Sequence, residues 1–344
     1  MADPGFSSSD AAGILRVPFF ELLERLTRAL RQLDFDPENA ALCARLFAET
    51  TRDGVYSHGL RRFPRFAAMV RSGLVRPNAV PVQTAQCGAL ERWDGQAGPG
   101  NLNAWRSMDR AIALARASGI GCVALANTNH WMRGGTYGWQ AAEAGVVGLC
   151  WTNTLPNLPP WGGTTPALGN NPLVLAVPRA TGPVLLDIAM SQFSYGALEA
   201  YHARGELLPV VGGFDAAGEL TRDPAAIEAA QRPLPIGFWK GSGLALVLDV
   251  IGAALAGGQA TCEIAQDPLR ESGLTQVFIA IGGAGAFGRN PNEVADAAIR
   301  FLQSSQPAAE GMRIRYPGEQ TLRLREENLA RGIPVDRVAW EELG

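Results

Sequence analysis

The chain has 344 residues, of which 47% are hydrophobic and 18% are charged, and its formal net charge is −3. A chain of this length and composition can bury a sizeable core in one or two domains, which excludes a disordered protein. The slightly acidic balance argues against nucleic acid as a partner, because proteins that bind phosphate backbones carry basic surfaces.

The cysteines and the apolar segments predict a reducing compartment and no contact with a membrane. The five cysteines lie far apart, form no CxxC pair and are odd in number, so we expect neither a disulfide framework nor a zinc site. Residues 1–10 lack the basic and apolar stretches of an export signal. Residues 243–258 are strongly apolar, but they contain Asp249 and are too short to span a bilayer. We therefore expect a cytoplasmic protein.

The N-terminal third is predicted to be helical. Residues 17–30 carry apolar side chains at helical spacing. A second helix is expected from Asp36, as its N-cap, to a stop at Gly54. A third helix follows, and because Pro64 must lie in its first turn, it begins near Leu60 or later.

Strands and helices alternate after about residue 80. Adjacent strand pairs together with this alternation predict an α/β fold in which helices cover a mixed β-sheet. Residues 155–172 are rich in proline and glycine and are expected to be mostly loop. The expected strands are 88–95, 121–128, 146–154, 173–178, 183–189 and 275–281; the expected helices are 101–119, 137–145, 194–205, a helix following Lys240, 291–303 and 319–332.

Residues 283–288 read GAGAFG, which matches the GxGxxG dinucleotide fingerprint between a predicted strand and a predicted helix. A Rossmann unit needs several further parallel strands after these glycines, whereas the remaining 56 residues predict almost only helix. We therefore interpret the segment as a glycine-rich loop. The sequence contains no Walker A, HExxH or GxSxG motif and no clustered metal ligands, so no metal is expected.

The chain has three histidines, and one of them stands in the stretch YSHGLRRF. Arg61 and Arg62 follow His58 closely. Two guanidiniums beside an imidazole suit an anionic substrate whose oxygen gains or loses a proton. A solvated loop or a core position could also hold this histidine. His202 lies among charged neighbours in a predicted helix and is expected at the surface.

His130 stands in NTNHWMRGG, directly after a predicted strand. Ligands of open α/β sheets bind at the carboxyl ends of strands, so His130 is a second candidate site residue. Four tryptophans fall within 31 residues here. They are candidates for the wall of a flat-ring site, with core packing as the alternative. These tryptophans are Trp131, Trp139, Trp151 and Trp161.

Lys240 is the single lysine of a chain whose other basic residues are arginines. A position that keeps lysine against this bias requires a compact, flexible ammonium, or else it is a surface position that kept lysine by chance. Two histidines, several arginines and this lysine suit the reduction of a carbonyl by a nicotinamide. An imidazolium would protonate the developing alkoxide, and arginine would bind a carboxylate through two parallel hydrogen bonds.

The chain resembles the type-2 malate/L-lactate dehydrogenase family, which comprises NAD(P)-dependent oxidoreductases unrelated to the Rossmann dehydrogenases. The resemblance extends from about residue 17 to the C-terminus. NHWMRGG favours the members that reduce 2-oxo sugar acids. The matching stretches are GVYSHGLRRFPRF, NHWMRGGTYGWQAAEAG, CWTNT, PPWG, FSYG, LPVVGGFD, FWKGSG, QVFIAI and YPGE.

The resemblance implies an α/β fold with a mixed, sulfolactate dehydrogenase-like sheet and a second, mainly helical domain. Residues 1–78 with 308–344 would form the helical domain that carries the proton donor, and residues 79–307 the domain that binds the cofactor. A homodimer is implied, with the cofactor near the subunit interface.

The resemblance also implies the roles of individual residues. His58 matches a proton donor, Arg62 an arginine that binds the substrate carboxylate, and His130 a second acid/base. Close relatives have Gly-His-Glu where this chain has Gly318-Glu319-Gln320, so this chain departs from them at Glu319 and Gln320. The implied cofactor contacts are Val184, Leu185, Leu186, Asp187, Ile188, Ala189, Trp239, Lys240, Gly318, Glu319 and Gln320.

The implied activity is NADH-dependent reduction of a 2-oxo sugar acid, 2,3-diketo-L-gulonate, to 3-keto-L-gulonate. NADP is the alternative cofactor. Malate, lactate, sulfolactate, ureidoglycolate or a cyclic imino acid are alternative substrates within the family. A sugar-acid-binding protein without catalytic activity is the alternative of another class.

Overall fold

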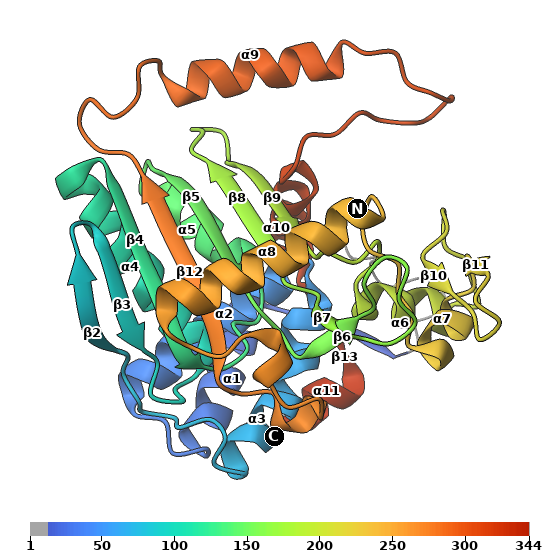
Figure 1. The fold of residues 1–344 in the computed structure, drawn as a ribbon, viewed down its shortest axis with the longest axis horizontal. Coiled ribbons are helices and arrows are strands. Elements are labelled where there is room, and N and C mark those ends of the chain that lie inside the picture. The colour runs from blue at the N-terminus through green and yellow to red at the C-terminus, as the bar shows by residue number, and fades with distance from the viewer. Residues whose placement is uncertain (1–12, 344) are drawn as a thin grey trace.

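The computed structural model describes residues 13–343 (Figure 1). The expectation about an export signal concerns residues 1–10, which lie outside the described residues. Throughout the described chain, helices and strands alternate much as the sequence predicts.

A mixed sheet of seven strands forms the centre of the fold, as predicted (Figure 1). The strand order is β2-β3-β4-β12-β5-β8-β9. The β3–β4 pair is parallel, and the other neighbouring pairs are antiparallel. The prediction missed β2, whose six residues are all exposed and carry little apolar signal. The strands are β2 (Val82–Cys87), β3 (Leu90–Asp94), β4 (Ile120–Thr128), β5 (Val147–Thr152), β8 (Leu173–Val177), β9 (Val184–Ile188) and β12 (Leu274–Ile281).

Helices cover both faces of this sheet. α4 (Gly100–Ser118) and α5 (Gly135–Glu143) pack on one face, and α8 (Trp239–Ala256) crosses the other (Figure 1). Successive residues of β12 show the two layers, because neighbouring side chains of a strand point to opposite faces. Val277 joins the apolar core beneath α8, whereas Phe278 joins the core beneath α4 and α5.

The tryptophans do not form the wall of one site. Trp131 and Trp139 are buried in the core beneath α4 and α5, while Trp151 is buried in the core beneath α8, so the sheet separates them. Trp161 is 45% exposed and packs on Phe238 instead, with ring centroids 5.0 Å apart. Core packing, the alternative interpretation, therefore accounts for the first three, and the four tryptophans do not form one wall.

The sheet topology confirms that GAGAFG is not a Rossmann fingerprint. The strand before it, β12, is antiparallel to both of its neighbours, β4 and β5. A dinucleotide fold needs a parallel strand–helix–strand crossover at this point. The glycine-rich loop instead leads to α9 (Pro291–Gln303), which projects from the body of the molecule (Figure 1).

The predicted N-terminal helices form as α1 (Phe19–Arg31), α2 (Pro37–Arg52) and α3 (Phe63–Arg71). Asp36 caps α2 as expected, because its carboxylate accepts the Asn39 N–H at 2.7 Å.

The C-terminal segment packs against these helices. β13 (Ile333–Asp336) pairs with β1 (Ile14–Val17), which brings the two ends of the described chain together. α10 (Glu319–Arg331) and α11 (Arg337–Glu341) flank this pair. One apolar core joins residues 17–75 with residues 333–343, while the predicted domain boundaries stay a prediction.

By length and composition, one helix of the described chain, α8, could cross a membrane. Its inner side packs on the sheet through residues such as Ala245 and Leu248. Asp249 is buried, and its carboxylate accepts hydrogen bonds from Asn153 and from the Thr261 N–H at 3.0 Å each. These contacts are those of a helix docked on a sheet.

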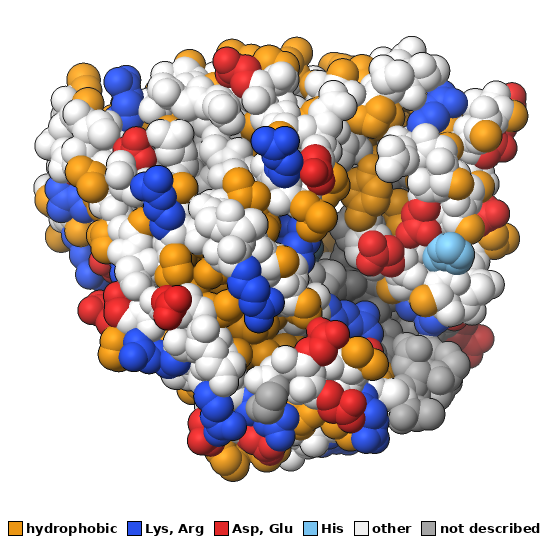
Figure 2. All heavy atoms as spheres, turned by 90° about the horizontal axis from the view of Figure 1, so that it is seen from below, with side chains coloured by type: hydrophobic (Ala, Val, Ile, Leu, Met, Phe, Trp, Pro, Cys, Tyr) orange, Lys and Arg blue, Asp and Glu red, His pale blue; other side chains and the backbone are white. Residues whose placement is uncertain are grey.

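Figure 2 shows basic and acidic side chains interspersed over one face of the molecule.

Candidate active site

His58 lies in a short segment pinned between α2 and α3. Two 3-10 turns, Tyr56–His58 and Leu60–Arg62, connect these helices. The hydroxyl of Thr51, near the end of α2, accepts the N–H of Leu60 at 3.0 Å. Gly59 is required here, because a Cβ on this residue would come within 2.4 Å of that hydroxyl. His58 therefore precedes α3, as the sequence predicts.

His130 lies in the loop that follows β4. The side-chain amide of Asn129 fixes this loop by donating to the carbonyls of Leu74, Ala97 and Gly98. Met132 adopts a left-handed conformation with φ of +64°, which is uncommon for a residue other than glycine. Its N–H donates to Nδ1 of His130 at 3.0 Å. The backbone thus holds the imidazole in one orientation.

The two histidines lie together, although they are 72 positions apart in the sequence. Their ring centroids are 5.8 Å apart and their planes differ by 23°. The structure therefore brings the two predicted acid/base candidates into one site. Ser57 Oγ lies 2.9 Å from Nδ1 of His58. α6 (Tyr195–Ala203) closes in on this site, since a Cβ on Gly196 would come within 2.8 Å of the Ser57 side chain.

The hydrogen bonds distinguish the two imidazoles. Nδ1 of His130 accepts from a backbone N–H, so a neutral His130 carries its proton on Nε2. Protonating Nδ1 would place two donors face to face and break this bond. Nδ1 of His58 meets a hydroxyl, which can donate or accept. His58 can therefore change its protonation state without losing its partner.

Burial and neighbouring cations keep both histidines neutral at pH 7. Desolvation, followed by the charges of Arg62 and Arg133, lowers the pKa of His58 to about 4. Desolvation, Arg62, the His58 ring and Arg65 hold the pKa of His130 well below its usual value. As whole residues, His58 and His130 are half-buried. A bound anion would offset the cations and raise these pKa values.

Arg62 supplies a cation beside the histidines. Desolvation and the charge of Arg65 lower its pKa to about 10, while Glu271 and Glu199 oppose this shift. Arg62 therefore stays charged at neutral pH. Its Nη2 lies 3.5 Å from Oε2 of Glu271.

Asp53 connects three parts of the chain around this site, and the sequence analysis missed it. Its buried carboxylate accepts from Arg133 at 2.7 Å, from Arg325 of α10 at 2.7 and 2.8 Å, and from Arg52 at 2.8 Å. Burial alone would raise the pKa of Asp53, but these guanidiniums hold it well below its usual value. The network fixes the His130 loop against α2 and α10.

The predicted cofactor segments meet β9, one of the two edge strands of the sheet. The Leu185 N–H donates to the Pro317 carbonyl at 2.9 Å, which places Gly318 beside the start of β9. The Ile236 N–H donates to the Met190 carbonyl at 2.9 Å, which brings the start of α8 to the other end. At about 3.3 Å per residue, these points are about 17 Å apart.

β9 also contacts the histidine loop. Oδ2 of Asp187 accepts the Gly135 N–H at 2.8 Å, at the start of α5. This bond joins the predicted cofactor strand to the segment that follows His130. Hydrogen bonds therefore link β9 to the segments before Gly318, before α8 and after His130.

Trp239 and Lys240 are exposed at the start of α8, beside Phe238, whose φ is +62°. Strained backbone of this kind clusters at functional sites. Their predicted contact with a cofactor stays a prediction. His202 is a surface residue as expected, with Nδ1 2.6 Å from Oε2 of Glu228.

A model of malate/L-lactate dehydrogenase sequences matches residues 17–344. The chain belongs to the malate/L-lactate dehydrogenase family. It is 45% identical to the 2,3-diketo-L-gulonate reductase of Citrobacter koseri over 339 residues, which cover 96% of this chain and 99% of that protein. This membership confirms the resemblance inferred from the sequence and identifies the chain as an oxidoreductase.

Solved structures of this family share the fold. Malate dehydrogenase from Pyrococcus horikoshii superimposes with a TM-score of 0.86 at 29% identity, covering 99% of this chain and 96% of that chain. Sulfolactate dehydrogenase from Methanocaldococcus jannaschii superimposes with a TM-score of 0.86 at 27% identity, covering 96% and 95%. The predicted sulfolactate dehydrogenase-like sheet is therefore confirmed.

Malate/L-lactate dehydrogenases use a nicotinamide cofactor, and one cavity of this chain is lined by arginines and by the carboxylates of Glu319 and Glu326. The cavity has a volume of about 280 Å³ and includes the predicted contacts Glu319 and Gln320. Oε1 of Gln320 accepts from Arg315 at 3.1 Å and from Arg323 at 3.2 Å, which holds two guanidiniums together. Arg313 also lines the cavity. Clustered guanidiniums of this kind bind phosphate groups.

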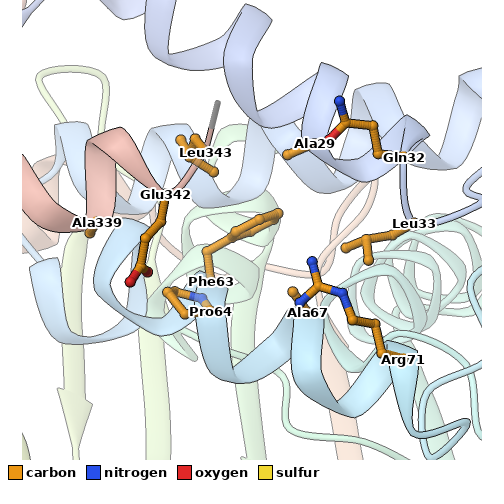
Figure 3. Close-up of a pocket in the computed structure, with 10 residues that line it drawn as sticks. All are labelled: Ala29, Gln32, Leu33, Phe63, Pro64, Ala67, Arg71, Ala339, Glu342 and Leu343. Atoms are coloured by element: carbon orange, nitrogen blue, oxygen red, sulfur yellow. The ribbon is translucent and has the colours of Figure 1, made fainter.

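A second cavity lies among the helices, away from β9. Its volume is about 260 Å³, and it lies between α1, α3 and α11. Figure 3 shows the Phe63 ring pointing into it. No histidine lines this cavity, so it does not form part of the candidate active site. No cluster of potential metal ligands occurs among the described residues.

Proposed function

We propose that this dehydrogenase reduces the keto group of a 2-oxo sugar acid, 2,3-diketo-L-gulonate, to 3-keto-L-gulonate with NADH. The paired imidazoles of His58 and His130 beside the charge of Arg62 carry this proposal. The 45% identity to a protein named for this reaction supports the substrate.

Each side chain has one role in this proposal. Arg62 binds the substrate carboxylate through paired hydrogen bonds. A bound nicotinamide cofactor would supply the hydride that the keto carbon requires. His58 gives its proton to the oxygen that becomes the hydroxyl, because its Nδ1 partner tolerates both protonation states. His130 stays neutral and donates its Nε2–H to the same oxygen, which stabilises the developing negative charge.

Substrate binding prepares His58 for this step. Without a ligand, Arg62 and Arg133 disfavour the imidazolium form. A carboxylate on Arg62 offsets part of this positive charge and raises the pKa of His58. The protein would therefore take up a proton when the acid binds.

The cavity beside Gln320 favours NADPH as a second cofactor. The guanidiniums of Arg315 and Arg323 both donate to Oε1 of Gln320. A phosphate beside Gln320 would accept hydrogen bonds from their other N–H groups. Arginine binds the 2′-phosphate of NADP in dinucleotide sites, whereas an acidic residue binds the free ribose hydroxyl of NAD. We propose NADH from the resemblance, and the arginines make NADPH the cofactor to compare.

We further propose a homodimer in the cytoplasm, with a small anionic substrate as the ligand. The outer side of α8 exposes apolar side chains, among them Leu246 at 51%, Val247 at 51% and Val250 at 56%. Contiguous apolar surface of this kind marks association sites. Light scattering of the purified protein, compared with a Val250→Glu variant, tests the dimer.

Loss of NADH and NADPH absorbance with a panel of 2-oxo acids tests the activity. Fast turnover of 2,3-diketo-L-gulonate, and little of pyruvate or oxaloacetate, is expected. Turnover of a simpler oxo acid or of an imino acid alone would retain the family and replace the substrate. If neither NADH nor NADPH is oxidised with any of these compounds, a sugar-acid-binding protein without catalytic activity would be favoured instead.

A further inference from the structure

A buried carboxylate lies beside the guanidinium that we assign to the substrate. Glu271 is 3% exposed and stands in the loop before β12. Its Oε2 is 3.5 Å from Nη2 of Arg62 and 3.3 Å from Nη2 of Arg65. Arg65 also donates to the carbonyl of Pro268, which ties this loop to α3. Glu271 is therefore held in place by the arginines that follow His58.

Glu271 shares its electrostatic surroundings with the paired histidines. The charge of Arg62 acts on His58 and His130 as well as on Glu271. Glu199 of α6 is a second carboxylate that acts on Arg62. A substrate carboxylate bound to Arg62 therefore has a fixed negative charge nearby, and a further anionic group on the substrate would be repelled.

We propose that Glu271 selects among 2-oxo acids: it excludes substrates with a second carboxylate and favours substrates whose carbon chain carries hydroxyl groups. This inference rests on the proposed function, because it requires Arg62 to bind the substrate carboxylate. Hydroxyl donors form short, charge-assisted hydrogen bonds with a carboxylate. Both guanidiniums meet Oε2, whereas a carboxylate can accept about four hydrogen bonds through its two oxygens.

The proposal differs measurably from a purely structural role. If Glu271 only oriented Arg62, its loss would lower kcat/KM for every carboxylate substrate by the same factor. If it selects by charge and hydrogen bonding, its loss changes the ratio between substrates. The ratio between a dicarboxylate and a polyhydroxylated monocarboxylate is therefore the quantity to measure.

Glu271→Gln keeps the shape of the side chain and removes its charge. We expect the ratio of kcat/KM for oxaloacetate to kcat/KM for 2,3-diketo-L-gulonate to rise by about tenfold or more, in the range of repulsive specificity elements. Glu91→Gln is the matched control: Glu91, on β3, is also buried, but it pairs with Arg110 of α4. This control should leave the ratio unchanged. An unchanged ratio in Glu271→Gln would overturn the proposal.

Binding of unreactive acids tests Glu271 separately from turnover. Calorimetric titration with D-gluconate and L-malate, in the presence of NADH, should show a relative gain for L-malate in Glu271→Gln. Glu271→Asp keeps the charge and should retain the wild-type preference for gluconate. This second variant tests the proposal even if Glu271→Gln does not fold. Absence of turnover in the wild type would reject the proposed function, whereas equal changes for both acids would reject the role of Glu271.

Discussion

The backbone N–H of Met132 donates to Nδ1 of His130 at 3.0 Å, and this bond fixes which nitrogen of the ring carries the proton. His58, 5.8 Å away between ring centroids, has a hydroxyl partner instead. The two imidazoles of one site are therefore not equivalent. One is held as a neutral donor, and the other is able to gain and lose a proton.

Separate substitutions should reveal this difference. We expect His58→Asn to lower kcat by about 10²- to 10⁴-fold, the usual contribution of general acid catalysis, with the Kd for NADH nearly unchanged. The decline of kcat with rising pH, where His58 of the substrate complex is deprotonated, should disappear in His58→Asn and persist in His130→Asn. Stopped-flow assays across pH measure both. Loss of this decline in His130→Asn alone would reverse the assignment.

Arg62 should control the KM for the acid. Arg62→Lys keeps the charge and loses the planar fork that matches a carboxylate, so we expect KM to rise about tenfold with a smaller change in kcat. Arg71→Lys at the end of α3, beside the cavity of Figure 3, is the control and should leave KM unchanged. Steady-state kinetics measure both constants. An unaltered KM in Arg62→Lys would contradict the role of Arg62 in binding the substrate carboxylate.

Asp53 should be important for stability. Asp53→Asn leaves the buried guanidinium of Arg133 without its counter-charge and weakens the tie to Arg325. Breaking a buried pair of this kind costs about 3–5 kcal/mol of unfolding free energy. Urea unfolding measures this cost. Glu21→Gln, which removes a surface pair with Arg25 at 3.8 Å, should cost about 0–1 kcal/mol. Similar costs for both variants would contradict the prediction.

The low pKa of His58 predicts how stability depends on pH. The unfolded chain protonates this histidine near pH 6.5, whereas the folded protein does so only near its pKa of about 4. Between these values the unfolded state binds more protons, so the unfolding free energy falls as the pH decreases from about 6.5 to about 4. The unfolding free energy plotted against pH over this range should be flatter for His58→Asn than for the wild type. Parallel curves for the two proteins would exclude this contribution.

The arginines beside Gln320 should affect the cofactor. We expect Arg315→Ala and Arg323→Ala to weaken binding of NADPH about tenfold more than binding of NADH if they meet the 2′-phosphate. Equal losses of affinity for NADPH and NADH would indicate that these arginines bind the pyrophosphate, which both nucleotides share. Fluorescence titration of each nucleotide measures both, with Arg331→Ala at the far end of α10 as a control. Unchanged affinities would show that the cofactor binds elsewhere.

Hydrophobic periodicity and caps identified most elements, because they are local. The Asp36 cap and the position of Pro64 bounded two helices correctly. The same reasoning missed β13 and β2. β13 is short and owes its existence to pairing with β1 at the opposite end of the chain. An exposed edge strand such as β2 has no apolar alternation to detect.

The sequence by itself determined the candidates: a histidine followed by arginines, a second histidine after a strand, and membership of an oxidoreductase family. Only the tertiary structure decided their arrangement. It stacked His58 on His130, brought Arg133 and Arg325 onto Asp53, and set Glu271 against Arg62. The reason is physical: motifs and periodicity record local backbone preferences, whereas these contacts join residues 72 to 272 positions apart through packing and charge.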